Sequence, residues 1–215
     1  MHRYLVTGTD TDVGKTRVTA MLALALKRAS NVPTVVKLVQ TGVAPGAPGD
    51  AERAGRLSGC AHQELARFLK PSDPWNAALA EALPPVQGQD LKRALEAIEG
   101  PIVAEGAGGL AVPLNSAETF ADVAECCGLS VVVVVGLRLG CINHALLTAA
   151  LLGQRRIGVA GAVLCERFGP TEATYHDDVL RALQGKLDVL GIIPFDVQER
   201  RSVDRGAQIF RKLVG

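Results

Sequence analysis

The sequence is poor in aromatic side chains, balanced in charge and free of long apolar runs. Only 4% of its 215 residues are aromatic although 48% are hydrophobic, so the core must be aliphatic. No apolar run approaches the ~20 residues that a membrane helix needs. The net charge is +1, with no basic footprint for nucleic acid or for a membrane surface. We therefore expect neither of these partners.

Cysteine is scarce and forms no paired motif. The five cysteines are Cys60, Cys126, Cys127, Cys141 and Cys165. Their number is odd, no C-x-x-C occurs, and the adjacent pair 126–127 has poor spacing for a metal site, so we expect reduced thiols. The glycine-rich segment described below starts at Gly8, which leaves no room for a signal peptide. Together these features predict a cytoplasmic protein.

Val-rich runs alternate with Ala/Leu-rich stretches along the chain. This order predicts a doubly wound, mainly parallel sheet flanked by helices, as in P-loop NTPases, and the length predicts one domain over residues 1–215. Strands are predicted at 4–7, 34–39, 101–105, 130–136, 157–164 and 187–193. Helices are predicted at 15–29, 51–57, 63–68, 90–99, 118–127 and 175–183. A further helix is predicted to end near residue 152, and the last one to begin at residue 203. The segment 70–76 is predicted to be irregular, with Trp75 as a candidate pocket residue.

The segment 8–16, GTDTDVGKT, is the most informative stretch. A short apolar run precedes it and an Ala/Leu-rich run follows, so strand, Gly-rich turn, Gly-Lys-Thr and helix occur in the order of a phosphate-binding loop. Lys15 would reach the outer phosphates and the Thr16 hydroxyl would bind Mg²⁺. Gly8 lies one residue earlier than the usual first glycine, and an ordinary turn is the alternative interpretation.

Three charged residues accompany the predicted strands. Lys37 lies inside strand 34–39, where a buried lysine needs an anion; the alternative is an edge strand with Lys37 in water. Asp50 is the only acid of the loop 40–50 and could cap the next helix, bind a metal ion, or both. Glu105 ends a strand before the glycine turn 106–109, and an acid at that place holds Mg²⁺ in phosphate-loop proteins.

All these residues fall at the predicted carboxyl ends of strands, where doubly wound sheets bind ligands. The segment 136–143 also lies there, and the helix start within it is suited to a carboxylate or phosphate. His144 is interpreted as a helix-packing residue rather than a base.

Four stretches together resemble the dethiobiotin synthetase family over nearly the whole chain. They are VTGTDTDVGKT at 6–16, Lys37 with Thr41-Gly42, VAEGAGGL at 103–110 and VVGLRLGCINH at 134–144. The resemblance implies the doubly wound fold and a homodimer with a shared active site. It also implies an ATP-dependent cyclo-ligase that converts 7,8-diaminononanoate and CO₂ to dethiobiotin through a carbamate and a carbamic–phosphoric anhydride, with ATP as co-substrate and Mg²⁺ as cofactor.

The resemblance also implies residue roles. Lys37 and Lys15 would be catalytic, neutralising the carbamate and the transferred phosphoryl group, and the metal ligands would be Thr16, Asp50 and Glu105. The nucleotide-binding set is Asp12, Val13, Gly14, Lys15, Thr16, Arg17, Asp50, Glu105, Gly106, Ala107, Gly108, Cys165, Glu166, Pro194, Phe195 and Asp196. The substrate-binding set is Thr11, Lys37 and Thr41, with Gly140, Cys141 and Asn143 supplied by the partner subunit to hold the distal carboxylate.

The chain departs from the family pattern at three places. The loop 41–50 is shorter than in some relatives, so Asp50 is assigned by its position and as the only acid of the loop; within it, Thr41 stands where the family usually has serine and keeps the hydroxyl. Arg138 stands where many members have lysine, which preserves the charge. The pair Cys165-Glu166 replaces an Asn-Asp pair that contacts adenine in well-known members. Because a thiol is a poor substitute for an amide in hydrogen bonding, we hypothesise relaxed nucleotide choice.

Three other classes remain as alternatives. A nucleotide-switch ATPase of the ParA/MinD kind shares the fold but carries an early loop lysine where this chain has Asp10, and a terminal amphipathic membrane helix that this chain lacks. A small-molecule kinase would need an Arg-rich lid, and the pairs 155–156 and 200–201 lie in no evident lid. A non-catalytic regulatory relative would not need the intact lysines and Glu105. Diamine-dependent hydrolysis of ATP separates all three from the synthetase.

Overall fold

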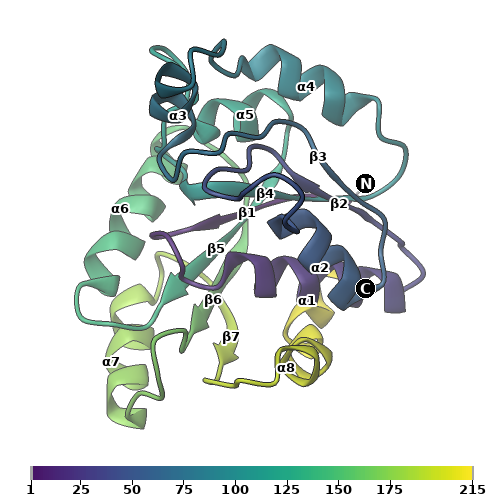
Figure 1. Ribbon diagram of the computed structural model, residues 1–215. Coiled ribbons are helices and arrows are strands. Elements are labelled where there is room, and N and C mark those ends of the chain that lie inside the picture. Colours follow the sequence, from purple (N-terminus) through teal and green to yellow (C-terminus); the bar gives the residue numbers. More distant parts are fainter. Residues whose placement is uncertain (1, 215) are drawn as a thin grey trace.

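The computed structural model describes residues 2–214. Within them the strands form one seven-stranded sheet in the order β3-β2-β4-β1-β5-β6-β7, and every neighbouring pair is parallel (Figure 1). The strands are β1 Arg3–Gly8, β2 Thr34–Lys37, β3 His62–Glu64, β4 Ile102–Gly109, β5 Ser130–Gly136, β6 Val159–Cys165 and β7 Val189–Ile193. The predicted doubly wound parallel sheet is confirmed.

Helices cover both faces of this sheet. They are α1 Lys15–Arg28, α2 Asp50–Ser58, α3 Pro74–Ala80, α4 Gly88–Glu96, α5 Phe120–Cys126, α6 Cys141–Gln154, α7 Ala173–Leu183, α8 Glu199–Gly206, the 3-10 helix η1 Ala207–Phe210 and α9 Arg211–Val214. In Figure 1, α1, α2 and α8 lie on one side of the sheet, and α3, α4 and α5 on the other. None of the helices in residues 2–214 has the length and apolar character to cross a bilayer.

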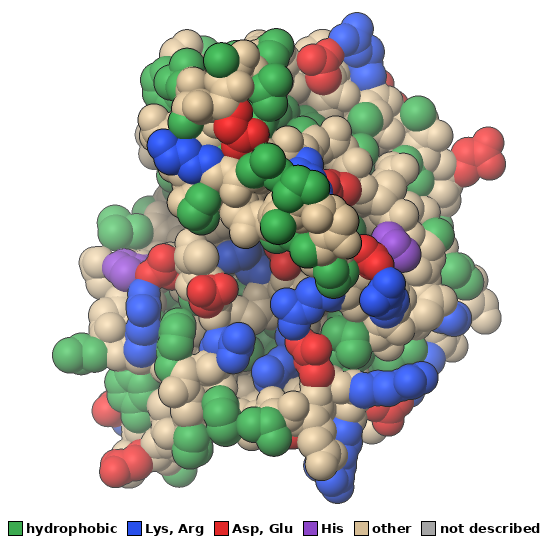
Figure 2. Space-filling model, in the orientation of Figure 1, with side chains coloured by type: hydrophobic (Ala, Val, Ile, Leu, Met, Phe, Trp, Pro, Cys, Tyr) green, Lys and Arg blue, Asp and Glu red, His purple; other side chains and the backbone are tan. Residues whose placement is uncertain are grey.

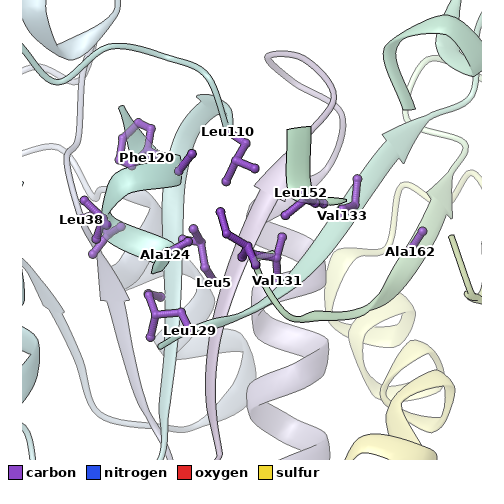
Figure 3. Close-up of a cluster of buried hydrophobic side chains, with 14 of the residues drawn as sticks. Leu5, Leu38, Leu110, Phe120, Ala124, Leu129, Val131, Val133, Leu152 and Ala162 are labelled. Carbon is purple, nitrogen blue, oxygen red and sulfur yellow. The ribbon is translucent and has the colours of Figure 1, made fainter. Parts of the chain in front are cut away.

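The two covered faces create two aliphatic cores. Along β5, Val131, Val133 and Val135 belong to the core under α4–α7, part of which Figure 3 shows, whereas Val132 and Val134 belong to the core under α1, α2 and α8. All five valines are fully buried. A strand buried on both faces needs no alternation of polar and apolar residues, which explains the unbroken valine run.

Three local predictions are wrong. The glycine segment 106–109 is not a turn, because β4 continues through it to Gly109. The segment 63–68 is not a helix: His62–Glu64 forms the edge strand β3, which pairs in parallel with β2. The segment 70–76 is not wholly irregular, because α3 begins at Pro74 and contains Trp75. The Asp73 side chain accepts a hydrogen bond from the backbone N–H of Asn76 at 3.0 Å, so Asp-Pro acts as a helix cap followed by a first-turn proline.

Candidate active site

The predicted phosphate loop joins the carboxyl end of β1 to the start of α1. Gly14 has φ +105°, a left-handed conformation that favours glycine, and a Cβ there would lie 2.8 Å from the Cys165 sulfur. Gly8 has no such φ, but a Cβ there would lie 3.0 Å from Nζ of Lys15. Lys15 folds back over the loop and donates a hydrogen bond to the Asp10 carbonyl at 2.9 Å. A Cβ at Gly8 would lie still closer to the Asp10 carbonyl oxygen, at 2.7 Å, and to Val13 Cγ2, at 2.8 Å. The early glycine is therefore explained by the loop that returns closely over it.

Next to the loop, Lys37 lies between two carboxylates. Its Nζ is 2.7 Å from Asp50 Oδ2 and 2.8 Å from Glu105 Oε1, and it also donates to the Gly106 carbonyl at 3.1 Å. Lys37 and Glu105 are level with each other in the pairing of β2 with β4, which brings the two side chains together. Lys37 is only 2% exposed, and β2 lies between β3 and β4, so the edge-strand alternative is wrong.

The charges in this cluster stabilise one another. Burial opposes the ammonium, but Glu105 and Asp50 outweigh it and hold the pKa of Lys37 above its ordinary value. Burial likewise opposes the Asp50 carboxylate, but Lys37 outweighs it and holds the pKa of Asp50 below its ordinary value. Burial is the dominant effect on Lys15, whose pKa is lowered. Lys37 and Asp50 therefore keep their charges at neutral pH.

Glu105 is also held by α1. The Thr16 hydroxyl donates to Glu105 Oε1 at 3.1 Å, and the Thr19 hydroxyl donates to Oε2 at 2.8 Å. Sequence reasoning missed Thr19, although its place three residues after Thr16 puts both hydroxyls on one side of the helix. Because no group of three His, Cys, Asp or Glu side chains suited to a metal ion occurs in residues 2–214, the predicted metal set rests on two carboxylates and one hydroxyl.

A cleft of about 840 Å³ opens over these groups. Figure 2 shows basic and acidic side chains gathered around the hollowed middle of this face. Of the predicted site residues, the cleft is lined by Thr11, Asp12, Gly14, Lys15, Thr16, Arg17, Lys37, Thr41, Asp50, Glu105, Ala107, Gly108, Phe195 and Asp196. The other predicted residues lie outside its lining: Val13, Gly106, Cys165, Glu166, Pro194, Gly140, Cys141 and Asn143.

Sequence reasoning also missed part of the lining. The additional residues are Gln40, Gly42, Val43, Arg53, Pro71, Ser72, Asp73, Val112, Arg167, Val197 and Glu199. Most of them lie in loops after strands, where position in the sequence gives little information about position in space. Gln40 closes the loop that precedes α2, because its side-chain oxygen accepts a hydrogen bond from the backbone N–H of Asp50 at 2.8 Å. Trp75 does not line the cleft, so its candidate role as a pocket residue is wrong for this cleft.

The pair Cys165-Glu166 is turned away from the cleft. Cys165 is fully buried behind Gly14, and burial raises the pKa of its thiol to about 11. The Glu166 carboxylate accepts hydrogen bonds from Thr171 N at 2.8 Å, Thr171 Oγ1 at 2.7 Å and Phe195 N at 2.9 Å, and it lies 2.9 Å from Nε2 of His176. Burial opposes the carboxylate, but these bonds lower its pKa to about 2. Glu166 therefore fixes the loops after β6 and β7.

The start of α6 forms a separate feature. Gly140 takes the left-handed φ of +92° just before the helix, and Leu139 beside it is 96% exposed. Asn143 is exposed, whereas Cys141 is buried with its sulfur 3.3 Å from the Tyr175 hydroxyl oxygen. The Cys141 N–H already donates to the Arg138 carbonyl at 3.0 Å, so this helix start offers a ligand its other backbone N–H groups and the Asn143 side chain, rather than the thiol.

Sequence comparison shows the family of the chain. It is 40% identical over 211 residues to the ATP-dependent dethiobiotin synthetase BioD of Rhodococcus jostii (strain RHA1), an alignment that covers 94% of this chain and 90% of that protein. The chain belongs to the dethiobiotin synthetase family. The BioD protein of Anaeromyxobacter sp. (strain K) is 42% identical over 178 residues, covering 80% of this chain and 79% of that protein. Residues 2–200 match the family described as AAA domain.

Solved structures show the same fold at low sequence identity. The cell division ATPase MinD of Pyrococcus furiosus superposes with a TM-score of 0.60 at 16% identity, covering 99% of this chain and 100% of that one. A ParA family ATPase from Chlorobium tepidum TLS gives 0.57 at 12% identity, covering 98% and 91%. These likenesses establish a P-loop NTPase fold for this dethiobiotin synthetase family member and nothing about its activity.

Proposed function

We propose that this chain catalyses the ATP-dependent closure of 7,8-diaminononanoate and CO₂ to dethiobiotin in biotin biosynthesis, releasing ADP and phosphate. As a family member it is an ATP-using ligase that acts on small molecules. The single observation that supports this most strongly is buried Lys37, placed between Asp50 and Glu105 next to the phosphate loop. A hydrolase needs only to position water, whereas a second buried cation beside Lys15 is suited to bringing two anions together.

In the proposed mechanism, one substrate amine takes up CO₂ as a carbamate and releases a proton. A carbamate oxygen then attacks the γ-phosphorus of ATP, and ADP leaves. The second amine attacks the carbon of the mixed anhydride, which closes the cyclic urea and expels phosphate together with a proton. Lys37 would neutralise the carbamate and Lys15 the transferred phosphoryl group, so both act most strongly where charge is concentrated in the transition state. Thr11 and Thr41, which line the cleft, would donate hydrogen bonds to the substrate.

We further propose Mg²⁺ as the cofactor. The Thr16 hydroxyl and the Asp50 and Glu105 carboxylates are hard oxygen ligands, and phosphate oxygens and water would complete the set. When bound, the ion would offset phosphate charge and orient the phosphate chain. We propose that the nucleotide is bound by the remaining predicted residues of the phosphate loop and by the segments 106–108 and 194–196. Most of these residues line the same cleft.

A homodimer with a shared active site is also proposed. The start of α6 lies outside the cleft lining of its own chain, and Leu139 and Leu147 on and beside this helix are 96% and 62% exposed. A second copy would cover these side chains and bring the N–H groups at Gly140–Asn143 to the distal carboxylate of the substrate. All five cysteines are free thiols, which supports the expected cytoplasmic location.

The test is phosphate release by the purified chain with MgATP and bicarbonate, with and without 7,8-diaminononanoate, followed by product mass. Release that depends on the diamine and yields the cyclic urea supports the proposal. Phosphate release at the same rate without the diamine would contradict the proposal. That result would favour a nucleotide-switch ATPase, an alternative that only the fold supports.

A further inference from the structure

The cleft extends past the phosphate loop in two directions. Toward β2 it is lined by Thr41, Pro71 and Asp73, and toward β7 by Phe195 and Asp196. The acid–lysine cluster lies on the β2 side, where the proposed phosphoryl transfer takes place. A nucleotide whose outer phosphates face that cluster therefore extends its base toward β7.

At the β7 end, exposed Arg167 and the Oδ2 atom of Asp196 line the cleft with no hydrogen-bond partner in the described part of the chain, whereas the neighbouring polar side chains have contacts within the chain. The Cys165 thiol is packed against the loop at Gly14, and the Glu166 oxygens already accept from Thr171, Phe195 and His176. Asp196 Oδ1 accepts from the backbone N–H of Gln198 at 2.7 Å. The two residues that replace the family's Asn-Asp pair are thus committed to contacts within the chain.

Arg17, directly after the phosphate loop, differs from Cys165 and Glu166 because its contacts within residues 2–214 leave one buried nitrogen unpaired. It is 8% exposed, lines the cleft, and donates through Nη2 to the Asp196 carbonyl at 3.3 Å. Its Nη1 is buried and has no hydrogen-bond partner among the described residues. A guanidinium has five donors and no acceptor, and an unpaired buried donor is costly. Because Nη1 is buried, the guanidinium must turn toward the cleft to reach a ligand, and a ligand that supplies an acceptor favours this turn.

We propose that Arg17 is a specificity-determining residue whose guanidinium turns toward the cleft and donates to a carbonyl oxygen of the nucleotide base. The inference rests on the proposed use of a nucleotide in this cleft. Cytosine, guanine and hypoxanthine present a carbonyl oxygen, whereas adenine has none and carries an exocyclic amino group that would face a donor with another donor. The chain therefore uses ATP but accepts carbonyl-bearing nucleotides at least as well.

The decisive experiment compares ATP with inosine triphosphate, in which the adenine amino group is replaced by a carbonyl, and with CTP. Affinities are measured by displacement of a fluorescent ADP analogue, without a need for turnover. The wild type should bind inosine triphosphate and CTP at least as tightly as ATP. Arg17→Met should weaken both by roughly ten- to a hundredfold, as expected for a lost hydrogen bond from a charged group, and leave ATP nearly unchanged.

Arg28→Met is the matched control, because Arg28 lies on the same helix, is exposed and pairs with Asp204 far from the cleft lining. Inorganic tripolyphosphate is the second control. If Arg17→Met weakens tripolyphosphate, or all nucleotides equally, Arg17 binds phosphate or is merely structural and the proposal is overturned. If Arg17→Met does not fold, Arg17→Lys replaces it. Independently of any variant, a wild type that binds ATP more tightly than inosine triphosphate overturns the proposal. Absence of diamine-dependent turnover would instead overturn the proposed function, with the binding data still deciding the role of Arg17.

Discussion

Replacing Lys37 by alanine tests the centre of the site. The change removes a cation that is 2% exposed and leaves the Asp50 and Glu105 carboxylates, 2.7 and 2.8 Å from its Nζ, without their counter-charge. Removing one partner of a buried ion pair typically costs about 3–5 kcal/mol. We expect the free energy of unfolding to fall by about this amount, measured by urea denaturation at pH 8.

The pH dependence gives a sharper test of the same reasoning. In the wild type the pKa of Lys37 is raised above 10.5, so its contribution is complete below that value and lost as the pH rises through the folded pKa. The Asp50 pKa is lowered from 3.8, so its contribution is complete above 3.8 and lost as the pH falls. In Lys37→Ala, burial is no longer offset by Lys37, so Asp50 binds a proton more readily when folded than unfolded. The stability deficit should therefore be smaller at pH 5 than at pH 8.

Turnover should suffer more than nucleotide binding. Removing one group that stabilises transition-state charge costs roughly 10²–10³ in kcat, whereas Lys15 and the loop still hold the phosphates. Diamine-dependent phosphate release and displacement of a fluorescent ADP analogue measure the two effects separately. The double variant Lys37→Met/Glu105→Gln should recover stability without recovering turnover. A near-normal kcat in Lys37→Ala, or a deficit that does not change with pH, would refute the account of the cluster.

Two further predictions concern the loops beside β6. The lowering of the Glu166 pKa from 4.5 to about 2 corresponds to at most ~3 kcal/mol of stabilisation, complete above pH 4.5 and lost toward pH 2. Glu166→Gln should therefore lower the melting temperature at pH 7 but not near pH 2, and an equal loss at both would contradict the hydrogen-bond assignment. The raised pKa of Cys165, about 11, and its full burial predict much slower alkylation by iodoacetamide at pH 8 than at exposed Cys126. Peptide mass spectrometry measures both rates, and comparable rates would show that Cys165 is accessible.

The parallel sheet and its ligand-binding edge could be predicted because they depend on local patterns. The valine run at 130–136 and the loop at 8–16 carry their structural meaning within a few residues. Lys37 and Glu105 could also be placed together, because each was predicted at the end of a strand and parallel strands end together; in the structure Lys37 ends β2 and lies level with Glu105 within β4. Placing them in one site needed only the fold class.

The remaining features depend on contacts distant in sequence. The strand His62–Glu64 has three polar residues and forms only because β2 offers an open edge. The pair Cys165-Glu166 occupies the expected position, yet its side chains turn toward Gly14 and Thr171, a choice that no local pattern encodes. The unpartnered nitrogen of Arg17 becomes visible only once the packing around it is known.

The strand register also determines where this chain tolerates changes in length. Val6 of β1 is level with Glu105 of β4, and Glu105 is level with Lys37 of β2. Inserting one residue in any of these strands would shift the chain beyond it by ~3.3 Å and exchange the residues that face the two cores. The loop from Gln40 to Asp50 obeys no such rule, because it pairs with no strand of residues 2–214: it is held at its ends by the Gln40 bond to Asp50 and by α2, and between them by two Arg67 hydrogen bonds of 3.3 Å to the Ala44 and Ala47 carbonyls. We therefore expect natural and engineered changes in length to be tolerated in that loop. The strands do not tolerate them, because their register sets the distances between the charged side chains.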